Sequence, residues 1–143
     1  MLYEFAKNIN SNVVLFENGH LTNLTQPNFI FRKKRPEDLS WKKEELGDYV
    51  IENNGEIVAN GGFLLHYNIP FADLYMEVKK EYRRKGLGSF IIQELKKECF
   101  LEGRVPAARC NISNIESKAT LLKGGMKVCG YMLLGEIVKT KKL

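Results

Sequence analysis

A short glycine-containing turn at residues 83–88 constrains the fold of this chain more than any other feature, because it joins a candidate strand to a candidate helix. The strand covers residues 71–78 and is apolar enough to be central in a sheet. Beyond the turn, apolar residues recur at spacings of three and four, which places them on one face of an α-helix. These residues are Leu87, Phe90, Ile91, Leu95 and Cys99. Gly103 is expected to cap the C-terminus of this helix.

The residues before this unit predict antiparallel strands. Residues 48–52 and 56–60 flank an Asn-Asn-Gly turn and form the clearest hairpin, because Asn and Gly accept the positive φ of a tight turn. Residues 63–67 continue the second arm or add a strand, and a bulge is expected at Gly61 and Gly62.

Weaker patterns complete the expected fold. Further strands are expected at residues 28–32, 107–112 and 126–138. A short polar helix is expected at residues 37–46. A second helix is expected after Asn114, which is a good N-cap, and should end at Gly124 and Gly125. This order of elements predicts a mixed α/β or α+β single domain.

The N-terminal region fits this pattern least. It combines a short helical pattern at residues 2–9 with an apolar run at residues 13–16. We therefore expect residues 1–27 to be an appended segment and residues 28–143 to form the main domain. The sequence leaves open whether the segment is a native start or the edge of a longer protein.

Composition restricts the class of protein. A chain of 143 residues suffices for one compact domain, and no stretch approaches the ~20 apolar residues of a membrane span. Cys99, Cys110 and Cys129 are an odd number at wide spacings, so we expect reduced thiols rather than disulfides or a zinc site. With no secretory signal visible, a cytoplasmic location is expected. The net charge of +5 favours an anionic partner, such as a phosphorylated small molecule, anionic lipid or nucleic acid.

The turn at residues 83–88 has the chemistry of an anion-binding site. Gly86 and Gly88 lack Cβ atoms, so the backbone can turn sharply and direct consecutive N–H groups toward one point. The first N–H groups of the following helix lack acceptors within the helix, and the helix dipole adds positive potential. Arg83, Arg84 and Lys85 add cations. The pattern predicts a diphosphate cradle, although it also fits a plain turn with solvated basic side chains.

Two segments resemble motifs of the GCN5-related N-acetyltransferase (GNAT) superfamily. Residues 78–89 are similar to its [Q/R]-x-x-G-x-[G/A] motif, which follows a central strand. Residues 114–126 are similar to its second segment, in which Asn-x-x-Ser opens a helix that ends at a Gly-Phe pair, here Gly125-Met126. The resemblance covers residues 29–138. It implies a mixed, mostly antiparallel central sheet flanked by helices, with a splayed parallel strand pair that holds the cofactor.

The resemblance also implies that acetyl-CoA is the co-substrate and that no metal is needed. The pantetheine arm would insert between the splayed strands, at residues 76–78 and 109–112. The N–H groups of residues 84–89 would bind the pyrophosphate. The implied cofactor-binding residues are Met76, Glu77, Val78, Arg83, Arg84, Lys85, Gly86, Leu87, Gly88, Ser89, Asn111, Asn114 and Ser117. For Asn114, a plain N-cap role is equally expected, and the two roles are compatible.

The implied reaction is direct attack of a neutral amine on the thioester, which needs a base, an oxyanion donor and an acid. The family often uses a tyrosine seven residues after the motif asparagine as the acid, but that position here is Leu121. Either Tyr131, Cys110 or a water serves as the acid, or the thiolate leaves with little help. Glu77 is the leading candidate for the base and Asp73 is the second. Strand alternation puts both carboxylates on the same face of their strand.

The sequence thus predicts an N-acetyltransferase that moves an acetyl group from acetyl-CoA to a primary amine of unknown identity. A non-catalytic acyl-CoA-binding or interaction domain is the alternative, because the usual acid is missing. Nucleic-acid binding rests only on the net charge and a basic cluster at residues 31–35, without a recognisable module. No membrane partner is expected, and a homodimer is left open.

Overall fold

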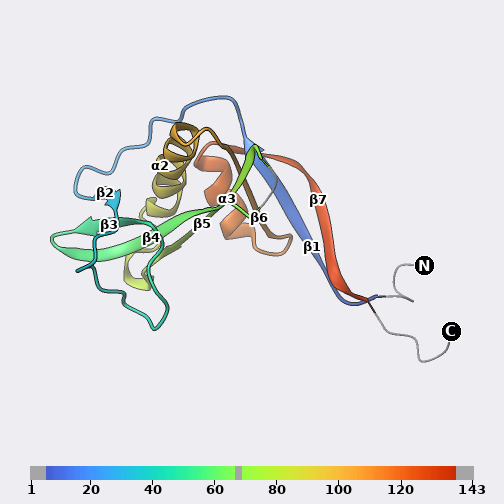
Figure 1. Cartoon of the computed structure of the whole chain (residues 1–143), viewed down its shortest axis with the longest axis horizontal. Helices are drawn as coiled ribbons and strands as arrows, with labels where there is room; N and C mark the ends of the chain where they lie inside the picture. The colour runs from blue at the N-terminus through green and yellow to red at the C-terminus, as the bar shows by residue number, and fades with distance from the viewer. Residues whose placement is uncertain (1–5, 67–68, 138–143) are drawn as a thin grey trace.

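The computed structural model describes residues 6–66 and 69–137, in which seven strands form one sheet (Figure 1). Its order is β2-β3-β4-β5-β6-β1-β7, and its neighbours are antiparallel except for the parallel pair β5–β6. The strands are β1 Ala6–Glu17, β2 Ile30–Lys33, β3 Tyr49–Asn53, β4 Glu56–Leu64, β5 Phe71–Val78, β6 Val105–Asn111 and β7 Met126–Ile137. The helices are α2 Leu87–Leu101, α3 Ile115–Lys123 and the short 3₁₀ helix η1 Lys80–Tyr82. The mixed, mostly antiparallel α/β fold is confirmed, with β5 at the centre of the sheet.

The glycine pair in β4 has a different role from the one expected. β4 pairs continuously with β5 through Gly61 and Gly62, so the bulge predicted there is wrong. The register of β3 against β4 shifts instead at Val58, which is the extra residue. The glycines permit close packing, since a Cβ on Gly62 would lie 2.7 Å from the hydroxyl oxygen of Tyr75.

β1 differs most from the sequence-based expectation. Residues 6–9 begin this strand, so the short N-terminal helix is wrong over its described part, and residues 2–5 lie outside the described chain. β1 lies between β6 and β7 and pairs with both, which makes it an inner strand of the sheet. β6 covers β1 only from Asn12 to Phe16, so β1 and β7 continue together as a two-stranded ribbon (Figure 1). An element of the segment expected to be appended is therefore hydrogen-bonded into the sheet.

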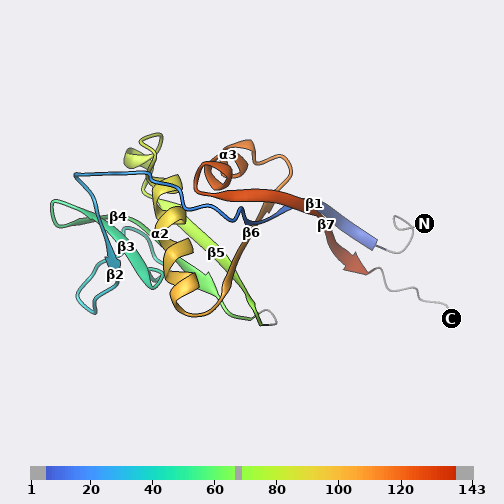
Figure 2. The same cartoon turned by 90° about the horizontal axis from the view of Figure 1, so that it is seen from above.

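The connection from β1 to β2 runs along α2 (Figure 2). The side chain of Gln93 accepts from the N–H of Leu24 at 2.7 Å and donates to its carbonyl oxygen at 3.0 Å. Lys96 Nζ donates to the carbonyl oxygens of His20 at 2.7 Å and Gly125 at 2.8 Å. Gln93 and Lys96 are therefore buried although both are polar, and burial lowers the pKa of Lys96.

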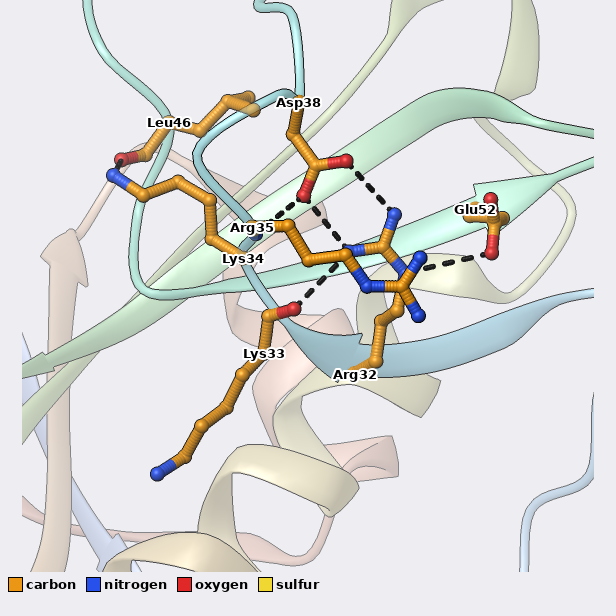
Figure 3. Close-up of polar contacts among 7 residues, drawn as sticks. All are labelled: Arg32, Lys33, Lys34, Arg35, Asp38, Leu46 and Glu52. Atoms are coloured by element: carbon orange, nitrogen blue, oxygen red, sulfur yellow. Dashed lines mark hydrogen bonds and ion pairs between the residues drawn. The ribbon is translucent and has the colours of Figure 1, made fainter.

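Residues 34–48 contain no helix, so the polar helix expected at residues 37–46 is wrong. Side chains hold the segment instead (Figure 3). Arg32 donates to both carboxylate oxygens of Asp38 at 2.8 and 2.9 Å, and Lys34 Nζ donates to the carbonyl oxygen of Leu46 at 3.2 Å. Asp38 also accepts the N–H of Arg35 at 2.7 Å, a local bond that competes with helix formation.

The two faces of the sheet are covered by different parts of the chain. A Cβ on Gly61 would lie 3.0 Å from Leu95 of α2, whereas Gly62 faces the hydroxyl of Tyr75, which also lies against Gly47. Since successive residues of a strand point to opposite faces, residues 34–48 cover the face opposite α2, which we call the outer face. The main core lies on the α2 side, where both helices contribute buried side chains. No helix within the described residues has the length and apolar character of a membrane span.

We expect Asp38→Asn to lower the free energy of unfolding by about 1–3 kcal/mol, because a partly buried charge-assisted pair is lost. The hydrogen bond from Arg32 lowers the pKa of Asp38 from 3.8 to about 2. Because the pKa of this carboxyl is lower in the folded protein than in the unfolded chain, the ionised carboxylate stabilises the fold at pH values above the unfolded pKa. This stabilisation is lost as the pH falls from about 4 to about 2. Urea unfolding across this range should therefore show the variant and the wild type converging in acid. A difference that stays constant with pH would contradict the assignment.

Candidate functional site

The parallel strands β5 and β6 separate after a short stretch of pairing. In the described chain their ladder ends at Asp73 on β5 and Ala107 on β6. β5 nevertheless continues to Val78 and β6 to Asn111, and their other edges pair with β4 and β1. The backbone N–H and C=O groups beyond Asp73 and Ala107 therefore face each other across a gap, which we call the β5–β6 gap. The splayed parallel pair is confirmed, and an extended arm that carries amides could pair with both strands.

The turn between β5 and α2 follows directly on the unpaired end of β5. Arg84 and Gly86 have φ angles of 64° and 80°, so the backbone turns sharply before α2 begins at Leu87. Within the part of the chain that the structure describes, the N–H groups of residues 84–89 donate to no protein oxygen. These groups are therefore available to an anion, as a diphosphate cradle requires.

Gly88 allows this turn to lie between β5 and α3. A Cβ at this position would come within 2.9 Å of Thr120 Cγ2 in α3 and 3.2 Å of Met76 Cε in β5. The neighbouring hydroxyl of Ser89 donates to the carbonyl oxygen of Thr120 at 3.1 Å. Gly88 thus has a steric role that the sequence pattern did not specify, and α3 fixes the turn beside the gap.

The three basic side chains of the turn have different partners. Arg83 Nε donates to the carbonyl oxygen of the last β5 residue at 3.1 Å, so this side chain folds back onto the strand. Lys85 Nζ lies 5.1 Å from the centroid of the Tyr82 ring. Arg84 lies 4.0 Å from Glu116 of α3, and because both side chains are about nine-tenths exposed this pair is weak. Arg84 is therefore the cation of the turn with the most freedom to approach an anion.

The polar residues expected near the cofactor form caps around the start of α3. Asn114 Oδ1 accepts the N–H of Ser117 at 3.1 Å, which confirms the N-cap. Asn111 Oδ1 accepts the N–H and the hydroxyl of Ser113 at 2.9 and 2.6 Å. These bonds order the turn that joins β6 to α3. Cofactor contacts of Asn111, Asn114 and Ser117 remain predictions.

Asp73 and Glu77 both lie on the outer face of β5, in different surroundings. Asp73 sits where the β5–β6 pairing ends, with its side chain 12% exposed, and its Oδ2 lies 3.6 Å from Arg109 Nε of β6. Burial raises the pKa of Asp73, and the charge of Arg109 opposes this shift. Glu77 is 39% exposed and forms an ion pair with Lys42 from the 34–48 segment. The hydrogen bond to Glu77 raises the pKa of Lys42.

Sequence reasoning did not identify Lys42 or the pairing of Arg109 with Asp73. Both pairs join residues that are far apart in the chain, and no periodicity or motif marks them. The only indication in the sequence was that Arg109 lies on the second strand expected to border the cofactor.

The candidate acids lie at different distances from the gap. The cross-strand register aligns Cys110 of β6, Val13 of β1 and Tyr131 of β7. Tyr131 therefore lies on the edge strand, two strands from the gap, and is 65% exposed. Cys110 lies in the part of β6 that is unpaired with β5, and burial raises the pKa of its thiol. Leu121, which replaces the usual tyrosine, is buried in the main core.

The described residues add two facts about metal and thiol chemistry. Among them, no group of three or more His, Cys, Asp and Glu side chains is placed to hold a metal ion. Cys99 is buried, Cys110 is partly buried and Cys129 is exposed, and all three are free thiols in this structure.

Comparisons with known proteins agree with this geometry. The fold is similar to that of several solved structures, and sequence identities of this size show the fold alone. Three of them are a GNAT-family protein from Novosphingobium aromaticivorans (TM-score 0.70, 15% identity, 95% of this chain and 67% of that chain covered), an acetyltransferase from the GNAT family from Colwellia psychrerythraea (0.68, 14%, 96% and 59%), and a GCN5-related N-acetyltransferase-like protein from Streptococcus suis (0.64, 15%, 92% and 62%). The chain spans less than two thirds of the length of the last two. Among curated proteins, none matches the sequence.

A family model described as "Acetyltransferase (GNAT) family" matches residues 19–123. The match covers most of the chain and includes both the turn at residues 83–88 and the start of α3. The chain therefore belongs to the GNAT family of acetyltransferases.

Proposed function

We propose that this protein is an N-acetyltransferase that moves an acetyl group from acetyl-CoA to a primary amine. One observation carries the proposal: the β5–β6 gap opens beside a turn whose N–H groups have no protein acceptor. This arrangement fits a long arm with amides along its length and a diphosphate at one end. Bound acetyl-CoA would supply an activated acyl carbon.

The residues that would hold acetyl-CoA come from three places. Backbone groups of Met76, Glu77 and Val78 border the gap on β5. The turn contributes its N–H groups and cations, and the start of α3 lies beside them. The residues of the turn and of the region around the start of α3 are Arg83, Arg84, Lys85, Gly86, Leu87, Gly88, Ser89, Asn111, Asn114 and Ser117.

Asp73 is the carboxylate best placed to act as the base. It lies on the outer face at the inner end of the gap, and its raised pKa makes it a stronger proton acceptor than a solvated carboxylate. Arg109 contacts this carboxylate from the opposite strand and orients it. Glu77 is the other candidate, but the Lys42 ammonium occupies it. An external amine would have to displace Lys42 before Glu77 could accept its proton.

Cys110 and Tyr131 are the candidates for the acid that protonates the departing thiolate. Cys110 is favoured because it lies on the gap, and its raised pKa keeps the thiol protonated near neutral pH. Tyr131 would have to reach across β1 and β6 to take this role.

The proposed partners are acetyl-CoA and an amine-bearing acceptor, in the cytoplasm, without a metal, a membrane or nucleic acid. A homodimer would cover the exposed apolar side chains of the edge strand β7, including Tyr131 and Leu133.

The proposal predicts that the protein binds CoA and releases free thiol from acetyl-CoA when primary amines are supplied. Calorimetry measures the binding, and a thiol-reactive dye measures release against a panel of diamines, aminoglycosides, amino acids and lysine peptides. Omission of the amine controls for thioester hydrolysis. Binding without amine-dependent release would instead support a non-catalytic acyl-CoA-binding domain. The apolar Leu121 at the usual position of the acid favours this alternative. Absence of both activities contradicts the proposal.

A further inference from the structure

Lys42 places a primary amine against Glu77, one of the two candidate bases on β5. Its ammonium is paired with Glu77 on the outer face of β5, in the part of the strand that borders the β5–β6 gap. The pair is only partly exposed, with 29% of the Lys42 side chain and 39% of the Glu77 side chain accessible. A primary amine and a candidate base are therefore already in contact beside the gap, as an ion pair in which the hydrogen bond to Glu77 raises the pKa of Lys42.

Two anchors hold the backbone on either side of Lys42. Asp38 is bound by Arg32 on one side, and the N–H of Gly47 donates to Asn60 Oδ1 at 2.8 Å on the other. Between these anchors residues 39–46 have no helix or strand, and the four-carbon stem of lysine gives its amine further reach. The backbone on both sides of Lys42 is therefore anchored, and the side-chain stem supplies the motion that the amine needs.

The spacing along β5 is compatible with reaction at this amine. Glu77 lies four residues beyond Asp73, which corresponds to about 13 Å along a strand. A thioester midway along the unpaired stretch would lie roughly 7 Å along the strand from either residue, so the Lys42 amine has to leave Glu77 and cover this separation by motion of its four-carbon stem.

We propose that Lys42 is itself an acyl acceptor, modified in cis by an acyl-CoA thioester bound in the β5–β6 gap. This inference rests on the proposed function. Glu77 takes one proton from the Lys42 ammonium, and the neutral nitrogen forms a bond to the thioester carbonyl carbon as the carbon–sulfur bond breaks. The departing thiolate receives a second proton from that nitrogen. The products are N-acyl-Lys42, CoA thiol and one proton, which Glu77 releases to solvent.

Acylation would remove the charge of Lys42 and leave Glu77 without its cation. The modified protein then presents an unoccupied carboxylate to cationic acceptors on the outer face. The first acyl transfer would thus convert the protein into a form with a vacant ammonium site.

Mass spectrometry tests this inference, with Lys43 as an internal control. Lys43 is adjacent in sequence and exposed, and cleavage after Glu37 and Glu44 leaves both lysines in one peptide. After incubation with acetyl-CoA, fragment ions should show Lys42 acetylated at least about tenfold faster than Lys43, because the amine is held beside the thioester. The rate constant should not change with protein concentration.

Two variants and one parallel assay complete the test. Glu77→Gln should slow acetylation of Lys42 to the rate of Lys43, and Lys42→Arg should leave only the Lys43 background. Equal rates at the two lysines, or a rate constant proportional to protein concentration, would overturn the inference. Acetyl-CoA binding is measured on the same preparation. Intact binding with unmodified Lys42 refutes this inference alone, whereas loss of binding refutes the proposed function with it.

Discussion

Replacing Gly86 with aspartate should weaken CoA binding by about 30- to 1000-fold, because it puts a negative charge among the N–H groups proposed to hold the diphosphate. A like charge at about 5 Å costs roughly 2–4 kcal/mol at an effective dielectric constant near 20. Gly86 has a φ of 80°, a conformation that Asp and Asn adopt more readily than most residues. We therefore expect the variant to fold, and calorimetric titration with CoA to measure the loss directly.

Gly86→Asn is the matched control for this variant. Asparagine has nearly the same shape as aspartate, and its Cβ would meet the same atom, Gln26 Nε2, at 3.1 Å. The two variants thus share the backbone strain and the steric contact, and they differ in charge. The affinity difference between them should shrink as salt is added. Equal losses in both would assign the effect to shape, and wild-type binding in both would show that the cradle lies elsewhere.

Asp73→Asn should lower kcat by about 10²- to 10⁴-fold with little change in CoA affinity, if Asp73 is the base. The amide keeps the shape of the carboxylate but cannot accept the proton of the amine. The wild-type rate should rise with pH through the raised pKa of Asp73, because the active form is the carboxylate, and then level off. Thiol release measured at a series of pH values gives both the loss in kcat and the pH dependence of the wild-type rate.

Glu77→Gln provides the comparison within the same strand face. Glu77 is more exposed than Asp73 and is paired with Lys42 in the unmodified protein, so this variant should affect turnover of external amines far less in protein that carries no acyl group on Lys42. A large loss in Glu77→Gln with a nearly normal Asp73→Asn would reverse the assignment and make Glu77 the base.

Local signals predicted the parts of the fold that local chemistry determines. The β3–β4 hairpin follows from its Asn-Gly turn, α2 from its apolar spacing, and the start of α3 from the Asn114 cap. The helix predicted at residues 37–46 is wrong because polar composition alone suggested it. The ion pair of Arg32 and Asp38 instead holds this segment as an irregular chain over the sheet. That contact involves tertiary packing, which composition does not reveal.

The same division applies to the candidate site. The turn at residues 83–88 and the splayed strands could be predicted, because a contiguous motif encodes the turn and its resemblance implies the strands. The Lys42–Glu77 and Arg109–Asp73 pairs could not, because each depends on how distant segments meet on the outer face. Tyr131 was a candidate only because its place in the sheet was unknown. The register places it on an edge strand and places Cys110 on the strand that borders the gap.

The position of β1 has a consequence for how the molecule is assembled. Its partners Cys110 and Tyr131 lie far along the chain from Val13, so these contacts carry a large loop-closure entropy and form slowly. On the ribosome, β1 emerges before either partner strand exists, and its apolar side chains stay unburied until β7 has been made. The earliest described strand to be synthesised is thus expected to be among the last to find its place.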